Sequence, residues 1–445
     1  MPAVLEPEDI QHIVLTRAPA QTGRYEFVTF RDPPSARAWL AALIPTVQSA
    51  AAMASSLDQD DRWVTVAFTW NGLRALGLDE ASLDSFPEEF KQGMVARAEI
   101  LGDVGPNHPE NWVDGLASPD LHAIIILFAR DDAERERCEA RYETVAATVT
   151  GVERLSSLLL NAAPPFDHAH DHFGYRDRLS QPVIAGSGED ATPGSGPPLK
   201  AGEFILGYPD EEGVVAGAPR PEVLARNGSY MAYRRLRQHV GAFRAFLRDN
   251  ADTPEEQELL AAKLMGRWRS GAPLVLSPDR DDPELGADVR RNNDFNYAAM
   301  DPHGYAAPVG SHARRMNPRD TVANMNRRRM IRRGATYGPA VPEGAPDDGQ
   351  DRGIAAFIIC ASLVRQFEFA QNVWANDENF KDLGNERDPI IGTQDGTLDF
   401  KIPKRPIRKI IRGLPAFTTV VGGAYFFLPG LRALRFLAGL NGGDE

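Results

Sequence analysis

The chain lacks any long hydrophobic run. Its longest apolar stretch, Ile354–Leu363, covers about ten residues, whereas a helix that spans a bilayer needs about 20. The first residues, MPAVLEPEDIQHIVL, contain neither the basic segment nor the apolar segment of a signal peptide. We therefore expect no membrane partner and a cytoplasmic protein.

An excess of positive charge is also absent. The chain has 49 Lys and Arg against 62 Asp and Glu, a formal net charge of −13. This balance disfavours non-specific binding to nucleic acid or to anionic membranes, and we expect neither as a partner. Cysteine is scarce, since Cys138 and Cys360 are the two in the sequence. One disulfide is possible, but two buried free thiols, as in a reducing compartment, are the preferred interpretation.

The length of 445 residues exceeds the size at which one core keeps growing, so we expect two domains. A Gly-, Ser- and Pro-rich segment, AGSGEDATPGSGPPLK, interrupts the chain near its middle. We predict an N-terminal domain over residues 1–185, a linker over 186–200 and a C-terminal domain over 201–445.

The N-terminal part alternates strands and helices in its pattern. β-branched and aromatic residues predict strands at 11–17 and 25–32, with a turn between them. The same reasoning predicts a helix from 33 to 53, a strand at 62–70, a helix starting at 71, a central strand at 121–130 and a helix at 131–149. The order is that of an α+β fold with helices on a sheet.

The C-terminal part repeats this plan without a clear sequence repeat. A strand that runs into a helix is predicted at 229–251 and again at 353–376. A last strand at 417–430 contains a Gly–Gly pair. The polar, irregular stretch 276–304 is too long for an ordinary loop, which indicates either function or disorder.

A short segment, FDHAHDHFGYRDRLSQP, concentrates histidine and aspartate. His168, His170 and His172 could contribute to a zinc or iron site. Such sites require fixed geometry and supporting contacts, and a polar surface loop that leads into a turn explains the segment more simply. We prefer the loop.

Eight arginines fall between Arg314 and Arg333, an island of positive charge in an acidic chain. A solvated basic face is one interpretation, and a pocket for a small anion is another. A nucleic-acid surface would need interleaved aromatic residues, and Tyr337 alone is near. His312, at the edge of the island, could ligate the iron of a porphyrin whose carboxylates require cations.

Seven segments together resemble the dye-decolorising (DyP-type) peroxidases, heme enzymes of the dimeric α+β barrel superfamily, over nearly the whole chain. They are FGYRDRLSQP, GEFILGYPDEEG, NGSYMAYRRLRQHV, HARRMNPRD, IRRGATYGP, RQFEFAQNVWAN and GGAYFFLPG. The resemblance implies two ferredoxin-like α+β domains, with heme held mainly in the second. It implies a peroxidase that uses hydrogen peroxide to oxidise organic substrates in one-electron steps, and pairing into a homo-oligomer is possible.

The resemblance also implies the site. It places the proximal ligand of one heme b per chain, and thus the metal ligand, at His312, the distal arginine at Arg332 and the distal acid at Asp177. The heme propionates are expected to pair with one of three arginines rather than with all of them. These candidates are Arg314, Arg315 and Arg319.

One position departs from the family pattern. The motif Gly-x-x-Asp-Gly reads Gly174-Tyr175-Arg176-Asp177-Arg178 here, so Arg178 stands beside the heme site where the family has glycine. A glycine there can serve a positive φ or a close approach to heme. A guanidinium beside Asp177 should lower the pKa of that acid, which weakens it as a base but keeps it ionised at lower pH. The alternative function is therefore a heme-binding or heme-handling protein with weak turnover, and a third is a non-heme protein that binds another anion.

We expect Arg178→Gly to change the pH dependence of the reaction between heme and peroxide, because it removes the cation beside Asp177. Stopped-flow rates of both proteins across pH measure the effect. Identical rates at every pH would show that position 178 has no influence.

Overall fold

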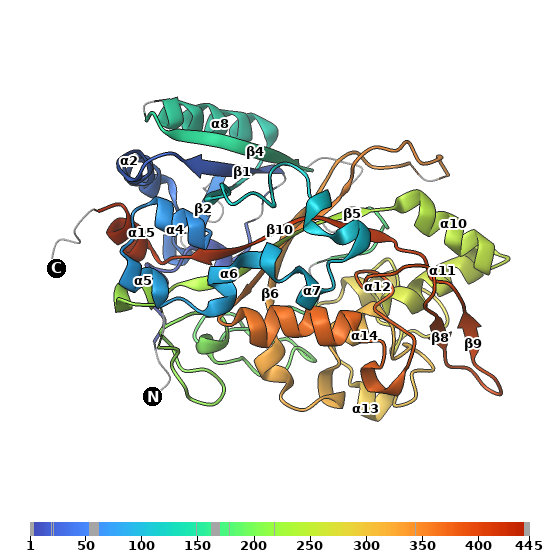
Figure 1. Cartoon of the computed structure of the whole chain (residues 1–445). Coiled ribbons are helices and arrows are strands. Elements are labelled where there is room, and N and C mark those ends of the chain that lie inside the picture. Colours follow the sequence, from blue (N-terminus) through green and yellow to red (C-terminus); the bar gives the residue numbers. More distant parts are fainter. Residues whose placement is uncertain are drawn as a thin grey trace.

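A computed structural model describes residues 4–18, 20, 22–52, 62–147, 149–161, 170–177, 179–217, 219–342 and 344–439. Its centre is one eight-stranded sheet with the strand order β4-β1-β3-β2-β10-β5-β7-β6 (Figure 1). The strands are β1 (Thr22–Phe30), β2 (Arg62–Phe68), β3 (Ala123–Ala129), β4 (Val152–Leu160), β5 (Ser229–Gln238), β6 (Ile331–Tyr337), β7 (Gly353–Cys360) and β10 (Thr418–Leu428).

The two halves of the sheet share one topology. The N-terminal half has the order β4-β1-β3-β2 and the C-terminal half has the order β10-β5-β7-β6, both antiparallel. β2 and β10 join the halves, with Phe68 opposite Phe427. At the other end, Asn161 donates its N–H to the Thr336 carbonyl over 2.8 Å, so the sheet curls until β4 approaches β6. The α+β fold expected from the family resemblance is confirmed.

Helices cover the outer faces of both halves (Figure 1). Those of the N-terminal half are α1 (His12–Leu15), α2 (Pro33–Leu43), η1 (Ile44–Thr46), α4 (Trp70–Ala75), α5 (Glu80–Asp84), α6 (Glu88–Ala96), α7 (Ala98–Leu101), η2 (Gly105–Asn107), η3 (Pro109–Asn111) and α8 (Asp132–Ala147). Asp32 caps α2 by accepting the N–H of Ser35, and prolines occupy its first turn, which explains where the predicted helix begins.

The C-terminal half carries the remaining elements. They are η4 (Ala201–Glu203), α9 (Glu222–Ala225), α10 (Val240–Asn250), α11 (Pro254–Met265), α12 (Pro283–Ala287), α13 (Tyr297–Met300), α14 (His312–Met316), η5 (Arg319–Thr321), η6 (Met325–Arg328), the π-helical turns η7 (Leu363–Glu368) and η8 (Ala370–Asn376), η9 (Phe380–Asp382), the hairpin β8 (Phe400–Ile402) and β9 (Lys409–Ile411), and α15 (Leu431–Leu437). Within the predicted linker 186–200 the structure has no helix or strand among these elements. The predicted domain limits stay a prediction.

The interior of the curled sheet is filled by side chains from both halves. Tyr25 of β1 stacks at 4.8 Å from Phe357 of β7, and Tyr233 of β5 lies 5.2 Å from Phe357. These rings are buried, so this shared core links the halves beyond the single β2–β10 pairing. The opposite face of the sheet packs against the helices, as the two-residue period of a strand requires.

The Gly–Gly pair of β10 has a packing role. A register shift falls between Val420 and Gly422. A Cβ on Gly422 would lie 2.1 Å from Leu116, and one on Gly423 would lie 2.4 Å from the sulfur of Met94. A larger residue at either position would have to displace Leu116 or Met94, where the N-terminal half contacts β10.

Most expected elements are present, and two expectations are wrong. The helix predicted over 33–53 ends at Leu43, where the 3₁₀ turn η1 with its proline follows. Residues 11–17 form no strand, because the chain turns into the short helix α1 with all four of its side chains buried. Gln11 fixes this start by donating to the carbonyls of Val66 and Pro429. A short apolar run does not separate a buried helical turn from a strand.

Cys138 and Cys360 are both free thiols; Cys360 is buried as expected, whereas Cys138 is half-buried. Among the residues described, no helix is long and apolar enough to cross a membrane.

A buried ion pair ties the two halves together. Arg234 of β5 donates to both carboxylate oxygens of Asp103, over 2.5 and 2.6 Å, and both side chains are at most 5% exposed. We expect Asp103→Asn to lower the free energy of unfolding by about 3–5 kcal/mol, because Arg234 stays buried without its counter-charge. Urea denaturation measures the change.

The exposed pair Arg31–Glu153 provides the control, since both side chains are more than half exposed. Glu153→Gln should leave the urea midpoint unchanged within error. An equal loss of unfolding free energy in both variants would mean that the buried ion pair stabilises the fold no more than the exposed pair does.

Candidate functional site

A cavity of about 310 Å³ lies against the outer face of the C-terminal half-sheet. It is bounded by the loop 171–180, by β5–β7, by α14 and by the π-helical turns. Its walls are largely apolar, with Leu236, Ile354, Ile358, Phe367, Ile390 and Ile391 among the lining residues. His312, Arg332 and Asp177, far apart in sequence, all line it.

His312 is the first residue of α14, which follows Ser311 and ends at Met316, because Pro318 disfavours a helical conformation of Asn317 before it. Its Nδ1 contacts both oxygens of Asp388, at 3.0 and 3.2 Å. The carboxylate is fully buried and also accepts the N–H groups of Ile390 and Ile391. Burial favours the neutral acid, but His312 and these two N–H groups hold the pKa of Asp388 below its usual range.

The other ring nitrogen of His312 has no hydrogen-bond partner among the described residues. With Nδ1 occupied by Asp388, Nε2 is left with its lone pair and belongs to a side chain that lines the cavity. A histidine held on one nitrogen by a carboxylate is a typical metal ligand through the other.

Arg332 enters the cavity because of the strand period. In β6, Ile331 points into the shared core, Arg332 lines the cavity and Arg333 points away from it. The Arg332 guanidinium donates to the Leu179 carbonyl over 2.5 Å, and its backbone N–H donates to Gln181. Arg332 thereby ties the loop 171–180 to the sheet.

Asp177 belongs to a small hairpin in which His170 pairs with Arg176. The Asp177 side chain is exposed, and the structure gives its carboxylate no hydrogen bond or ion pair in the part of the chain that it describes. A carboxylate that lines a cavity without a partner is available to exchange a proton with a bound molecule. Arg178 lies outside the described residues.

The three arginines expected near an anion have different surroundings. Arg319 lines the cavity. Arg314 is turned toward Asp301 and the Ala307 carbonyl, and Arg315 donates to the carbonyls of Trp374 and Glu386. The structure therefore does not bring Arg314 or Arg315 to the cavity, because other groups already use their donors.

Two further arginines line the cavity that sequence reasoning missed. Arg267 and Arg329 donate to carbonyl and amide oxygens and have no carboxylate partner among the described residues. Burial, with Arg319 and Arg332 nearby, lowers the pKa of each to about 9. Arg329 belongs to the arginine island of the sequence, whereas nothing around Arg267 marked it.

This cluster of Arg267, Arg319, Arg329 and Arg332 suits an anionic ligand. Buried cations without counter-charges are unfavourable unless an anion joins them. Apolar walls, one available imidazole nitrogen and guanidinium groups fit heme, which presents a flat apolar ring, an iron and two carboxylates. Asp388 was also missed, since a single acid before Pro389 gives only a weak signal.

Neither His170 nor His172 lines the cavity that His312 lines, and His168 lies outside the described residues. His172 is buried with Nε2 at 2.8 Å from the Tyr337 carbonyl, and burial lowers its pKa to about 4. Within the described ranges, no cluster of three His, Cys, Asp or Glu side chains is arranged to hold a metal ion.

Comparison with known proteins shows the family of this chain. Residues 9–157 match the DyP dimeric alpha+beta barrel domain. A dye-decolorizing peroxidase from Mycena epipterygia is 31% identical over 98% of this chain and 87% of its own length. Peroxidase 2 from Mycetinis scorodonius is 33% identical over 96% of this chain and 86% of its own length.

Solved structures resemble the whole chain as well. The fungal DyP-type peroxidase from Auricularia auricula-judae superposes with a TM-score of 0.87 at 28% identity, covering 98% of this chain and 100% of the other. An ancestral D-type dye-decolorizing peroxidase gives 0.86 at 29% identity, covering 97% and 99%. The chain therefore belongs to the dye-decolorising peroxidase family and is a DyP-type peroxidase.

Proposed function

We propose that each chain binds one heme b through His312 and uses it to reduce hydrogen peroxide while oxidising small organic molecules in one-electron steps. The observation that carries this proposal is the single cavity that His312, backed by Asp388, shares with Asp177 and Arg332. Related proteins are named for dyes, so aromatic reductants are the proposed class.

Heme, when bound, supplies the iron at which peroxide is reduced and the oxidising equivalents that reductants consume. His312 Nε2 would hold the heme iron. Asp388 keeps the Nδ1 proton in place and increases the electron density that the imidazole donates. Arg319, with Arg267 and Arg329 beside it, supplies cations for the propionates.

Asp177 and Arg332 have different roles in the reaction with peroxide. The Asp177 carboxylate accepts the proton from one peroxide oxygen and returns it to the other, which leaves as water. The Arg332 guanidinium stabilises the negative charge that develops while the O–O bond breaks. The carbonyl of Leu179 holds that guanidinium at the cavity.

Asp177→Asn tests the function directly. The purified wild type, expressed with a heme precursor, should show a Soret band that changes rapidly with peroxide. The variant should keep the Soret band but react with peroxide at least about 100-fold more slowly, because the asparagine amide does not accept the peroxide proton. Asp190→Asn, an exposed acid that does not line the cavity, is the control. A wild type without a Soret band, or a fast variant, would contradict the proposal.

Asp388→Asn tests whether the Asp388 carboxylate strengthens His312 as an iron ligand. Asparagine keeps an oxygen for the Nδ1 proton but removes the buried charge, so the imidazole donates less to iron. We expect the heme reduction potential to rise and heme affinity or peroxide reactivity to fall by about 10–100-fold. Spectroelectrochemistry and transfer of heme to an acceptor protein measure these changes. Asp395→Asn, in the same loop but exposed, should change neither, and an unchanged potential in Asp388→Asn would contradict the assignment.

A further inference from the structure

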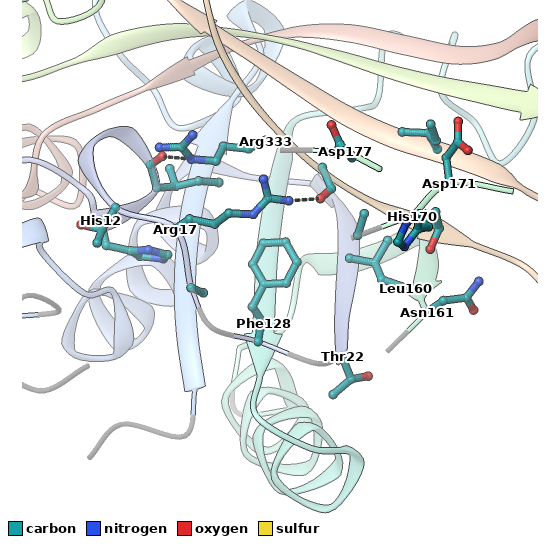
Figure 2. Close-up of a pocket in the computed structure, with 18 residues that line it drawn as sticks. His12, Arg17, Thr22, Phe128, Leu160, Asn161, His170, Asp171, Asp177 and Arg333 are labelled. Carbon is teal, nitrogen blue, oxygen red and sulfur yellow. Dashed lines mark hydrogen bonds between the residues drawn. The ribbon is translucent and has the colours of Figure 1, made fainter. Parts of the chain in front are cut away.

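A second carboxylate lies on the hairpin that carries Asp177. Asp171 lines the main cavity together with Asp177, and both also line a neighbouring cavity of about 70 Å³ (Figure 2). The hairpin is closed by the Asp171 N–H, which donates to the Tyr175 carbonyl, and by the pairing of His170 with Arg176. The two acids thus stand on opposite arms of one tight turn.

The Asp171 carboxylate is held at both oxygens. Oδ1 accepts the N–H of Tyr175 at 2.8 Å, and Oδ2 accepts Nε2 of Gln238 at 3.2 Å. Gln238 is the last residue of β5, and its side-chain oxygen Oε1 accepts the backbone N–H of His172. The ionised carboxylate suits this arrangement, because a proton on either oxygen would face a donor. Ionised Asp171 therefore fastens the hairpin to the sheet.

We propose that Asp171 is a positioning residue that strengthens Asp177 as a proton acceptor when its own carboxyl is ionised. The inference rests on the proposed role of Asp177 in the peroxide reaction. It adds a second acid to the distal side of the site and makes the reaction sensitive to the charge of that acid.

Two opposing effects set the charge of Asp171. Burial raises its pKa to about 6 and the nearby Asp177 carboxylate contributes to this, while the Tyr175 N–H, Gln238 and Arg269 act in the other direction. The repulsion between two carboxylates is reciprocal. When Asp171 loses its proton near pH 6, a second negative charge stands on the hairpin that carries Asp177, and both oxygens of Asp171 accept their hydrogen bonds.

Other charged groups around the hairpin come from several elements. Arg269 lies over the Tyr175 ring at 5.2 Å and pairs with Glu258 of α11. Arg332 of β6 shares the main cavity, and Arg17 and Arg333 share the second cavity (Figure 2). The second cavity also contains the rings of His12 and His170. Burial lowers the pKa of His12 to about 3, so that ring stays neutral as the pH rises through 6.

The test is the rate of reaction of the heme-loaded enzyme with peroxide between pH 4 and 8. The wild type should show an inflection near pH 6, where Asp171 ionises, with a rise in rate of about threefold. Asp171→Asn should lack this inflection. Asp84→Asn, an exposed acid of α5 that lines neither cavity, should keep it.

Asparagine presents a donor to Gln238, so Asp171→Ser is the second variant. Serine is neutral and its hydroxyl accepts a nearby N–H in the same kind of turn. Both variants should lose the inflection, and cyanide binding, followed by the Soret shift, should lose it as well. An inflection that persists in both variants would overturn the inference.

Thermal stability gives a readout independent of turnover. A carboxyl with a raised pKa in the folded state stabilises the fold below its unfolded pKa, and this contribution disappears as pH rises through about 6. The wild-type Tm minus the Asp171→Ser Tm should therefore fall from pH 4 to pH 7. A constant difference would count against the inference. A wild type that binds no heme or ignores peroxide overturns the proposed function, and this inference with it, whatever the Tm values show.

Discussion

The contact between His312 and Asp388 is the constraint around which the candidate site is arranged. A fully buried carboxylate has to be satisfied on every side, and Asp388 meets this demand with groups from several segments. Its carboxylate contacts the imidazole of His312 on α14 and accepts the N–H groups of Ile390 and Ile391. Its own backbone N–H donates to the Ala375 carbonyl of η8. Helix α14, the turn η8 and the loop after it are thereby fixed relative to one another.

The arginines around this centre have two distinct functions. Arg314 and Arg315 are buried and donate hydrogen bonds to backbone carbonyls and to Asp301. They thereby fix α14 to the segments packed against it. Arg319, together with Arg267 and Arg329, lines the cavity and lacks an acid partner among the described residues. The first set stabilises the walls of the site, whereas an anion bound in the cavity would offset the charge of the second set.

This division explains what the sequence could and could not predict. Motif resemblance correctly predicted the family and the α+β fold, and the residue pattern predicted most strands, because motif order and strand period are local features of the sequence. It treated Arg314, Arg315 and Arg319 as equivalent, since neighbours in sequence do not reveal which way a guanidinium turns. Asp388 and Asp171 escaped notice because their importance comes from partners at distant positions, His312 and Gln238.

The shared topology of the two halves raises the question of why the cavity lies on one of them. In the N-terminal half, the equivalent face is covered closely, since Trp39 and Leu40 of α2 are buried against the strands and a space of about 50 Å³ is left beside Cys138 and Tyr142 of α8. In the C-terminal half the same face presents Gln238 and Arg332, and the loop 171–180 lies across it. Polar side chains at the strand ends prevent close helix packing. The outer face of the C-terminal half-sheet therefore borders a cavity that a ligand can occupy, where the N-terminal half-sheet has closely packed helices.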